Sequence, residues 1–248
     1  MKNFLLFILF TNLIFSQQKE TFVNANEKYN SGDFVSAIQK YNEIIINGDH
    51  SPEVYFNLGN AYYKLDSLAL GIYYYEIGLK YFPNDFNLSQ NLEYLNHLTI
   101  DDIEALPFDI VSKKTDYIFN YFSLHTWSLL CIALGVTSSF LFLFYSLSNS
   151  TRIKRITFTL FVLSYILTSC LLFISFKKYN IQNNFQYAIV FDETVEVNLE
   201  PNNNSEVLFE LHEGTKIEIL EDFDEDWIKI KLADGQIGWV IKNQIKVI

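Results

Sequence analysis

Two long apolar segments, separated by only eight residues, constrain this chain more than any other feature. Residues 122–147 carry no Asp, Glu, Lys or Arg, and residues 156–176 form a second such segment. As helices, which rise about 1.5 Å per residue, they would extend about 39 and 31 Å and cross a hydrocarbon core of about 30 Å. The buried core helix of a soluble protein is the alternative, but such helices are rarely so long and so uniformly apolar. The sequence therefore predicts a two-helix transmembrane hairpin in an integral membrane protein.

The distribution of charge supports the same interpretation. The 248 residues include 29 acids and 18 Lys or Arg, for a net charge of −11. Residues 122–178 contain five of the bases and no acid, whereas the acid excess lies in residues 18–121 and 179–248. Two acidic, soluble-looking blocks thus flank one basic, apolar block. Nucleic-acid phosphates bind clusters of Lys and Arg, so we expect no nucleic-acid partner.

The first 17 residues have the composition of a secretory signal peptide. Lys2 precedes an almost unbroken run of Phe, Leu and Ile, and Ser16 stands before the polar region. A basic start, an apolar stretch of about 7–15 residues and a small residue at the end are typical of such signals. An uncleaved membrane anchor is the alternative, although the stretch is short for a span of about 20 residues. We expect export.

The loop between the two apolar segments indicates their orientation. Residues 148–155 contain three bases, and short basic loops face the cytoplasm. Lys177 and Lys178, beyond the second segment, reduce this bias. An export signal followed by two spans independently gives the same topology. We therefore expect the chain in the bacterial inner (cytoplasmic) membrane, with both soluble blocks in the periplasm.

Residues 18–98 repeat themselves with a period of 34 residues, which is the helix–turn–helix period of tetratricopeptide repeats. We expect repeats at about 18–51 and 52–85, followed by a helix over 86–98. Because such arrays usually need about three repeats, we expect this helix or a partner protein to complete the core. The period is carried by six pairs: Ala25 and Gly59, Tyr29 and Tyr63, Phe34 and Leu68, Ala37 and Gly71, Ile38 and Ile72, and Tyr41 and Tyr75.

This block resembles tetratricopeptide proteins, whose concave groove is lined by the first helix of each repeat and holds extended peptides or partner helices. The resemblance implies that Asn26 and Asn60 hydrogen-bond a ligand backbone and that Lys64 pairs with a carboxylate. The alternative is that these residues only maintain the repeat, without a bound peptide. By position, the implied groove residues are Phe22, Asn26, Tyr29, Asn30, Phe56, Asn60, Tyr63 and Lys64.

Residues 187–248 change from helical spacing to short strands with alternating side chains. Ile228 and Ile230 share one face of such a strand, and Lys229 lies on the other. Asp234 and Gly235 follow, and an Asp-Gly turn between two β-rich runs is a strong hairpin signal. We therefore expect a small all-β domain.

The order of residues in this domain resembles the bacterial Src-homology-3 (SH3) domain. The resemblance rests on the ending Gly-x-x-Gly-Trp-Val at 235–240 and on the preceding Trp227. It implies a barrel that binds peptides or cell-wall material through an aromatic and acidic surface. Asp224 and Asp226, in the acidic loop before Trp227, are candidates for attracting a basic peptide or a cation. A solvated loop is the alternative, and we expect Trp239 in the core.

No set of residues with catalytic or metal-binding spacing occurs in the sequence. The four histidines are far apart, and none has a metal partner at a suitable spacing. A glycine-rich phosphate loop, a nucleophile elbow and a HExxH motif are all missing. Cys131 and Cys170 lie inside the predicted spans, where we interpret them as small apolar residues. We therefore expect no enzyme activity, metal or cofactor.

The order of these parts resembles the BatE-type Bacteroides aerotolerance proteins over essentially the whole chain. The resemblance implies a non-enzymatic inner-membrane subunit that assembles with von Willebrand factor A-type membrane proteins encoded beside it. The expected parts are a signal peptide (1–17), a tetratricopeptide domain (18–98), a linker (99–121), a span (122–147), a cytoplasmic loop (148–155), a second span (156–176), a linker (177–186) and an SH3-like domain (187–248).

The leading hypothesis for this multidomain membrane protein is a scaffold that presents two periplasmic interaction modules. An envelope sensor or anchor, whose SH3-like domain binds peptidoglycan or a peptide, is the main alternative. A third reading is a chaperone-like repeat that holds unfolded proteins. The sequence alone names no partner.

Overall fold

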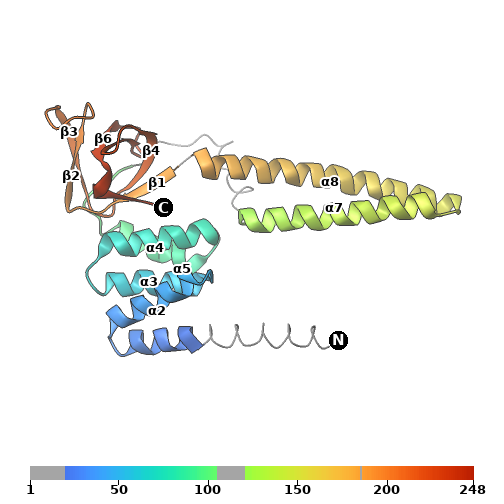
Figure 1. The fold of residues 1–248 in the computed structure, drawn as a ribbon, viewed down its shortest axis with the longest axis horizontal. Helices are drawn as coiled ribbons and strands as arrows, with labels where there is room; N and C mark the ends of the chain where they lie inside the picture. The colour runs from blue at the N-terminus through green and yellow to red at the C-terminus, as the bar shows by residue number, and fades with distance from the viewer. Residues whose placement is uncertain (1–19, 105–120, 185) are drawn as a thin grey trace. The chain divides into compact units, whose positions relative to one another are not determined.

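The computed structural model describes residues 20–104, 121–184 and 186–248 (Figure 1). They belong to two compact units. The first unit joins the residues before position 108 to those from Gln186 to the end, and the second contains the residues between. The expected signal peptide, at 1–17, and most of the expected linker at 99–121 lie outside the described residues.

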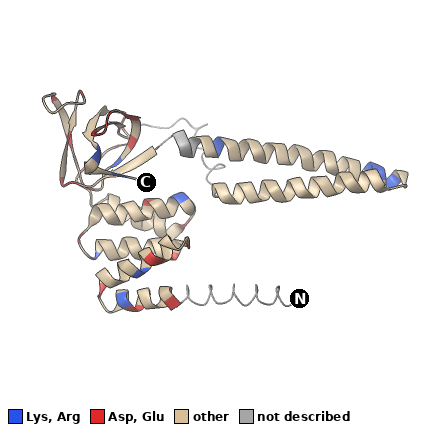
Figure 2. Ribbon diagram, in the orientation of Figure 1, with Lys and Arg blue, Asp and Glu red and all other residues tan. Residues whose placement is uncertain are grey.

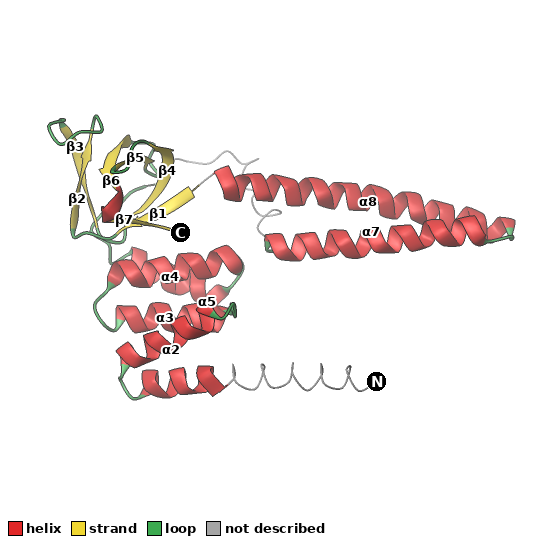
Figure 3. Ribbon diagram, viewed as in Figure 1, coloured by secondary structure: helices red, strands yellow, loops and turns green. Residues whose placement is uncertain are grey.

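The N-terminal part of the first unit is helical, as predicted (Figure 3). Helices pair in antiparallel hairpins, and the first helices of successive hairpins lie side by side. After a first helix over residues 20–30, the elements are α2 (Phe34–Ile46), α3 (Pro52–Tyr63), α4 (Leu68–Tyr81) and α5 (Phe86–Asn96).

The helix starts keep the 34-residue period of the sequence. Ser51 caps α3 and Asp85 caps α5, each with a side-chain oxygen that accepts a hydrogen bond from a backbone N–H three residues later. Asp33 and Ser67 precede α2 and α4 at the same spacing. Helix α5 therefore begins where the first helix of a third repeat would begin.

The C-terminal part of the first unit is one antiparallel sheet, also as predicted, with strand order β3-β2-β6-β5-β4-β1-β7. Its inner face buries Val195 and Val197 of one strand against Ile228, Ile230 and Val240 of two others. The strands are β1 (Gln186–Val190), β2 (Thr194–Asn198), β3 (Val207–His212), β4 (Lys216–Asp222), β5 (Trp227–Lys231), β6 (Ile237–Ile241) and β7 (Ile245–Val247), and the short helix η1 (Lys242–Gln244) precedes β7.

The helices and the barrel share their cores. Ile189 of β1 is fully buried in the same hydrophobic cluster as Tyr55, Ile72 and Leu88 of the helices. Conversely, Ile103, which follows α5 in the helical part, packs against the core of the barrel. The third-repeat helix and the barrel thus together cover the end of the helical array. The helices and the sheet, which lie far apart in the sequence, therefore form one compact unit.

A carboxylate fixes this junction. Asp101, in the segment after α5, accepts hydrogen bonds from the His212 backbone N–H at 2.7 Å and from the Thr215 hydroxyl, and its other oxygen lies 2.7 Å from His212 Nδ1. Burial by itself raises the pKa of Asp101, but the hydrogen bonds from Thr215 and His212 outweigh it and hold the pKa below its usual value. At neutral pH the segment is therefore tied to the barrel by a charged acceptor.

The second unit is a hairpin of α7 (Leu124–Leu147) and α8 (Thr151–Asn184). Both helices are long and apolar enough to cross a membrane. Phe142 lies against Phe161, with ring centroids 5.4 Å apart, and the two helices run antiparallel. The hairpin buries only 17% of the most apolar window of α7 and none of that of α8, unlike the core helix of a soluble protein.

The boundaries of the hairpin differ from the expected ones. Helix α8 starts at Thr151, so the bases expected in a loop over 148–155 lie in its first two turns (Figure 2). The connection that remains is only 148–150. Sequence reasoning placed the helix start where the charges end, but Arg and Lys have a good helix propensity and extend the helix beyond its apolar part.

Candidate functional site

The asparagines expected to face a ligand in the helical groove are partly used inside the fold. Asn60 Oδ1 accepts hydrogen bonds from the Tyr75 hydroxyl at 2.8 Å and from Asn91 Nδ2 at 3.2 Å. Burial raises the pKa of Tyr75 to about 12, so its hydroxyl stays protonated and donates. The Nδ2 group of Asn60 has no hydrogen-bond partner among the described residues.

The same arrangement occurs 34 residues earlier. Asn26 Oδ1 accepts from the Tyr41 hydroxyl at 2.6 Å and from Asn57 Nδ2 at 3.0 Å. Each asparagine therefore bonds a tyrosine of its own hairpin and an asparagine on the first helix of the next one. The repeated network explains why these residue types recur at this spacing.

The other expected groove residues divide into packed and exposed ones. The rings of Phe22 and Phe56 lie 6.2 and 6.4 Å from Tyr41 and Tyr75. The remaining four are Tyr29, whose ring lies 5.3 Å from that of Phe34, Tyr63, whose hydroxyl lies 3.3 Å from that of Tyr94, and the exposed Asn30 and Lys64.

These contacts predict that Asn60 and Lys64 respond differently to substitution. Asn60→Ala is expected to lower the free energy of unfolding by about 1–3 kcal/mol, because Tyr75 loses its acceptor and Asn91 loses one of its two. Lys64→Ala is expected to change it by less than about 0.5 kcal/mol. Thermal unfolding of the purified full-length protein measures both. Equal stability of the two variants would contradict the network. Because Lys64→Ala is expected to leave the stability nearly unchanged, it is the better variant for testing binding in the groove.

The acidic loop before Trp227 is tied to a base of its own chain. Lys242 Nζ forms an ion pair with Asp222 and donates a hydrogen bond to the backbone carbonyl of Asp224. The backbone N–H of Lys242 donates to the carbonyl of Asp226 at 2.9 Å. The carboxylates of Asp224 and Asp226 remain exposed, but the structure does not bring them to the cavity beside Trp227.

Trp239 does not occupy the position expected for it. Trp239 lies on the outer face of β6, because the neighbouring Gly238 and Val240 point inward. Its ring packs against Phe223, with centroids 5.4 Å apart, and Lys229 Nζ lies 5.5 Å from its centre. The expectation of a core position for Trp239 is therefore wrong.

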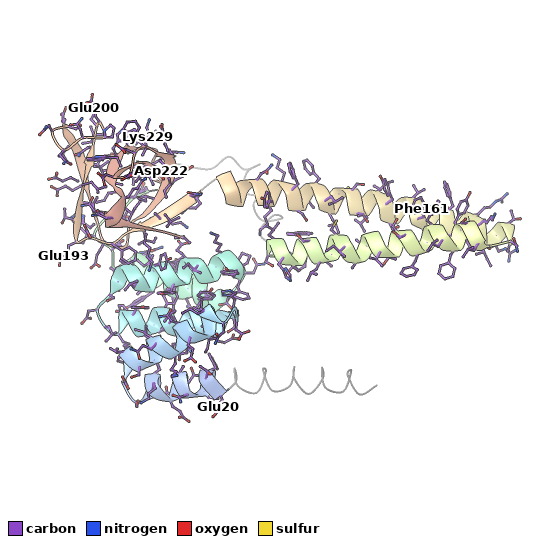
Figure 4. All side chains as sticks on the ribbon, viewed as in Figure 1. Glu20, Phe161, Glu193, Glu200, Asp222 and Lys229 are labelled. Atoms are coloured by element: carbon purple, nitrogen blue, oxygen red, sulfur yellow. The ribbon has the colours of Figure 1, made fainter. Side chains whose placement is uncertain are left out.

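Trp227 contributes to a cavity of about 410 Å³ on the outer face of the barrel. Alternation along β2 directs Thr194, Glu196 and Asn198 to this face, while Val195 and Val197 point into the core. Figure 4 labels Glu193 and Glu200, just outside the two ends of β2. Glu210 of β3 and Ile241 of β6 also line the cavity.

Sequence reasoning named Trp227 and missed its neighbours. The alternation of polar and apolar residues at 194–198 was visible and indicated that one face of this strand is exposed. Which strand lies opposite, and in what register, depends on the fold. The pairing of Glu196 with Glu210 could therefore not be predicted from the sequence.

No group of three or more His, Cys, Asp or Glu side chains within the described residues is arranged to hold a metal ion. One ion pair, between Lys216 and Glu76 at 2.7 Å, links the barrel to α4.

Comparison with known proteins identifies the barrel. Residues 199–245 match the family model of the bacterial SH3 domain. The matched segment begins directly after β2 and includes β3 to β6. No curated protein matches the chain. The C-terminal part of the chain therefore contains a bacterial SH3 domain.

Proposed function

We propose that this chain is a non-enzymatic membrane scaffold that presents a helical-repeat groove and an SH3 domain to protein partners. The observation that carries the proposal is the shared core, in which Ile189 of the barrel fills the end of the helical array. A junction of this kind holds two recognition surfaces in a fixed arrangement. The helical part is interpreted as tetratricopeptide repeats because its caps and its asparagine network recur every 34 residues.

Purification from native membranes in a gentle detergent tests the scaffold directly. We expect at least one other membrane protein to co-purify, and we expect Lys64→Ala to reduce its amount while leaving the stability of this chain unchanged. Repeated recovery of the chain alone would contradict the proposal. If many unrelated, unfolded proteins co-purify with the wild-type chain and are lost from Lys64→Ala, the chaperone-like interpretation is favoured instead.

Membership of a particular complex rests on the resemblance to BatE-type aerotolerance proteins. That resemblance favours von Willebrand factor A-type membrane subunits from the same operon as the partners. Photo-crosslinking from position 30, at the end of the first helix, or from position 64, directly after α3, identifies the bound protein in living cells; both positions are exposed. A crosslinked protein of another type would remove this part of the proposal and leave the scaffold intact.

We further propose that the soluble unit is periplasmic and that α7 and α8 cross the inner membrane. The compact first unit supports an even number of crossings between residues 104 and 186, because both segments must be on the same side to share a core. A cysteine introduced by Ser150→Cys, in a background without Cys131 and Cys170, is expected to react with a thiol reagent only from the cytoplasmic side. Labelling from outside intact cells would reverse the orientation.

A second candidate function is an envelope sensor or anchor, in which the SH3 domain binds peptidoglycan or a peptide. The cavity beside Trp227 favours it, because ligand sites are concave, and this one places the polar side chains of Glu196, Asn198 and Glu210 beside Trp227 and Ile241. Sedimentation of the full-length protein with purified sacculi, compared with its Trp227→Phe variant, tests cell-wall binding. Absence of the wild-type protein from the pellet would rule out cell-wall binding.

A further inference from the structure

Two carboxylates face each other across the hairpin of β2 and β3. Glu196 and Glu210 are directly opposite in the strand register, and both line the cavity beside Trp227. Like charges in this position destabilise an antiparallel pair. Within the described part of the chain neither carboxylate has an ion pair or a hydrogen bond, and no basic side chain lines the cavity. The fold therefore maintains a local negative charge that it does not neutralise.

A buried acceptor in the same lining also lacks a donor. Asn198 is 93% buried, and its Oδ1 atom has no hydrogen-bond partner. Its Nδ2 group donates to the backbone carbonyl of Asn202 at 3.4 Å, so the amide cannot be turned around without placing two acceptors together. An unpaired buried acceptor costs free energy, and a ligand that donates a hydrogen bond here removes that cost.

The apolar part of the lining favours an organic cation over a metal ion. Trp227 is the aromatic residue of the cavity, and the face of an indole ring attracts ammonium and guanidinium groups. Ile241, which pairs with Trp227 across β5 and β6, adds an aliphatic wall. Long basic side chains place their methylene stem on such a surface and their charge at its edge. A metal ion would gain nothing from either residue.

The position of the hairpin favours a peptide as the carrier of this cation. Strand β3, which holds Glu210, ends the strand order, so its outer backbone edge is unpaired within the described sheet. An extended peptide can add to such an edge through backbone hydrogen bonds and insert alternate side chains into neighbouring pockets. The acidic charge of the C-terminal block is complementary to a basic segment.

We propose that the cavity formed by Glu196, Asn198, Glu210, Trp227 and Ile241 binds a lysine or arginine side chain of an extended peptide segment in a partner protein. An ammonium group offers three donors, which match the two carboxylates and the amide oxygen of Asn198. This inference rests on the proposed role of the SH3 domain in recognition and names the chemistry that it recognises.

The test measures binding of a defined probe to the full-length protein in detergent. The probe is a fluorescent, end-blocked peptide with one central lysine among alternating Thr and Val, and the reference peptide carries acetyl-lysine instead. Fluorescence anisotropy at low ionic strength is expected to show about 10- to 100-fold weaker binding of the acetylated peptide. Equal binding of the two peptides would overturn the proposal.

Variants locate the site. Glu196→Gln and Glu210→Gln are each expected to weaken binding of the lysine peptide about 10- to 100-fold, and Trp227→Phe by a smaller factor. Glu193→Gln, an equal change of charge at an exposed position outside the cavity, is expected to leave binding within about twofold of wild type. An effect of Glu193→Gln as large as that of the other two would show a diffuse charge effect and contradict a defined site.

A stability measurement excludes misfolding as the cause. Removing one of two opposed charges is expected to raise the melting temperature by about 1–3 °C, so the Gln variants lose affinity while gaining stability. A lower melting temperature for both variants would contradict the idea that their repulsion is maintained for a ligand.

Co-purification with the variants distinguishes an error in this inference from an error in the scaffold proposal. A native partner retained by the Glu196→Gln, Glu210→Gln double variant would overturn the cavity's role and leave the scaffold intact. Loss of the partner from the double variant but not from Glu193→Gln would support it.

Discussion

Replacing Asp101 with alanine is expected to divide the unfolding of the first unit into two separate transitions. The substitution removes the acceptor of the His212 N–H and the Thr215 hydroxyl and the partner of the His212 ring. Hydrogen bonds to a charged group contribute about 1.5–3 kcal/mol each, and the buried donors would be left unpaired. We expect a total loss of about 3–5 kcal/mol, concentrated at the junction between helices and barrel.

The adjacent Asp102→Ala provides the matched control, because Asp102 is exposed and makes no hydrogen bond or ion pair within the described structure. Differential scanning calorimetry of the full-length protein separates one transition from two. A single transition in Asp101→Ala, at the temperature of the control, would show that the apolar contacts alone hold the junction.

Lowering the pH should reproduce part of the destabilisation expected for Asp101→Ala. The pKa of Asp101 in the folded protein lies below its unfolded value of about 3.9. The stabilisation is therefore complete well above pH 4 and is lost as the pH falls below that value, through the folded pKa. In the Asp101→Ala protein this part of the pH dependence disappears.

The second large effect is expected for Gly59→Ala. A Cβ atom at this position of α3 would lie 2.4 Å from Tyr75 Cε1, and Tyr75 is itself buried and hydrogen-bonded to Asn60. Alanine gains up to about 1 kcal/mol of helix propensity over glycine, but the displaced ring and its lost bond cost more. We expect a net loss of about 2–4 kcal/mol by thermal unfolding.

Gly135→Ala in α7 is the control for helix propensity. Its new Cβ atom would have Thr168 Cγ2 at 3.9 Å as its nearest neighbour, which is an ordinary contact. This variant is expected to be neutral or slightly more stable. If Gly59→Ala behaved in the same way, the close approach of α3 and α4 would not depend on the missing side chain.

Local and periodic features of the fold were predictable from the sequence, because they follow from short-range physics. Ser51 and Asp85 are good N-cap residues at the repeat spacing, and their positions fix the starts of α3 and α5. Gly235 adopts a φ of +94° in the turn that the Asp-Gly pair predicted. The apolar length of α7 likewise determined that helix almost to the residue.

Contacts between distant segments were not predictable. Asp101 and His212 are 111 residues apart, and nothing local marks either as the other's partner. The candidate cavity has the same origin, since Glu196 and Glu210 meet only after the hairpin takes its register. Acidity near Trp227 was therefore assigned to the loop that adjoins it in sequence, whereas the carboxylates beside its ring come from two other strands.

The shared core also sets an order of events during synthesis. The helical array is complete in sequence by residue 104, yet the surface that Ile189 covers stays open until the chain has been made beyond Gln186. At about 5–20 residues per second, the roughly 80 intervening residues take about 4–16 s. For that interval the newly made repeats expose an apolar patch while the two apolar helices are still emerging. The barrel thus covers this patch only late in synthesis. A ribosome that stalls within the hairpin leaves a helical array whose apolar end is exposed and prone to aggregate.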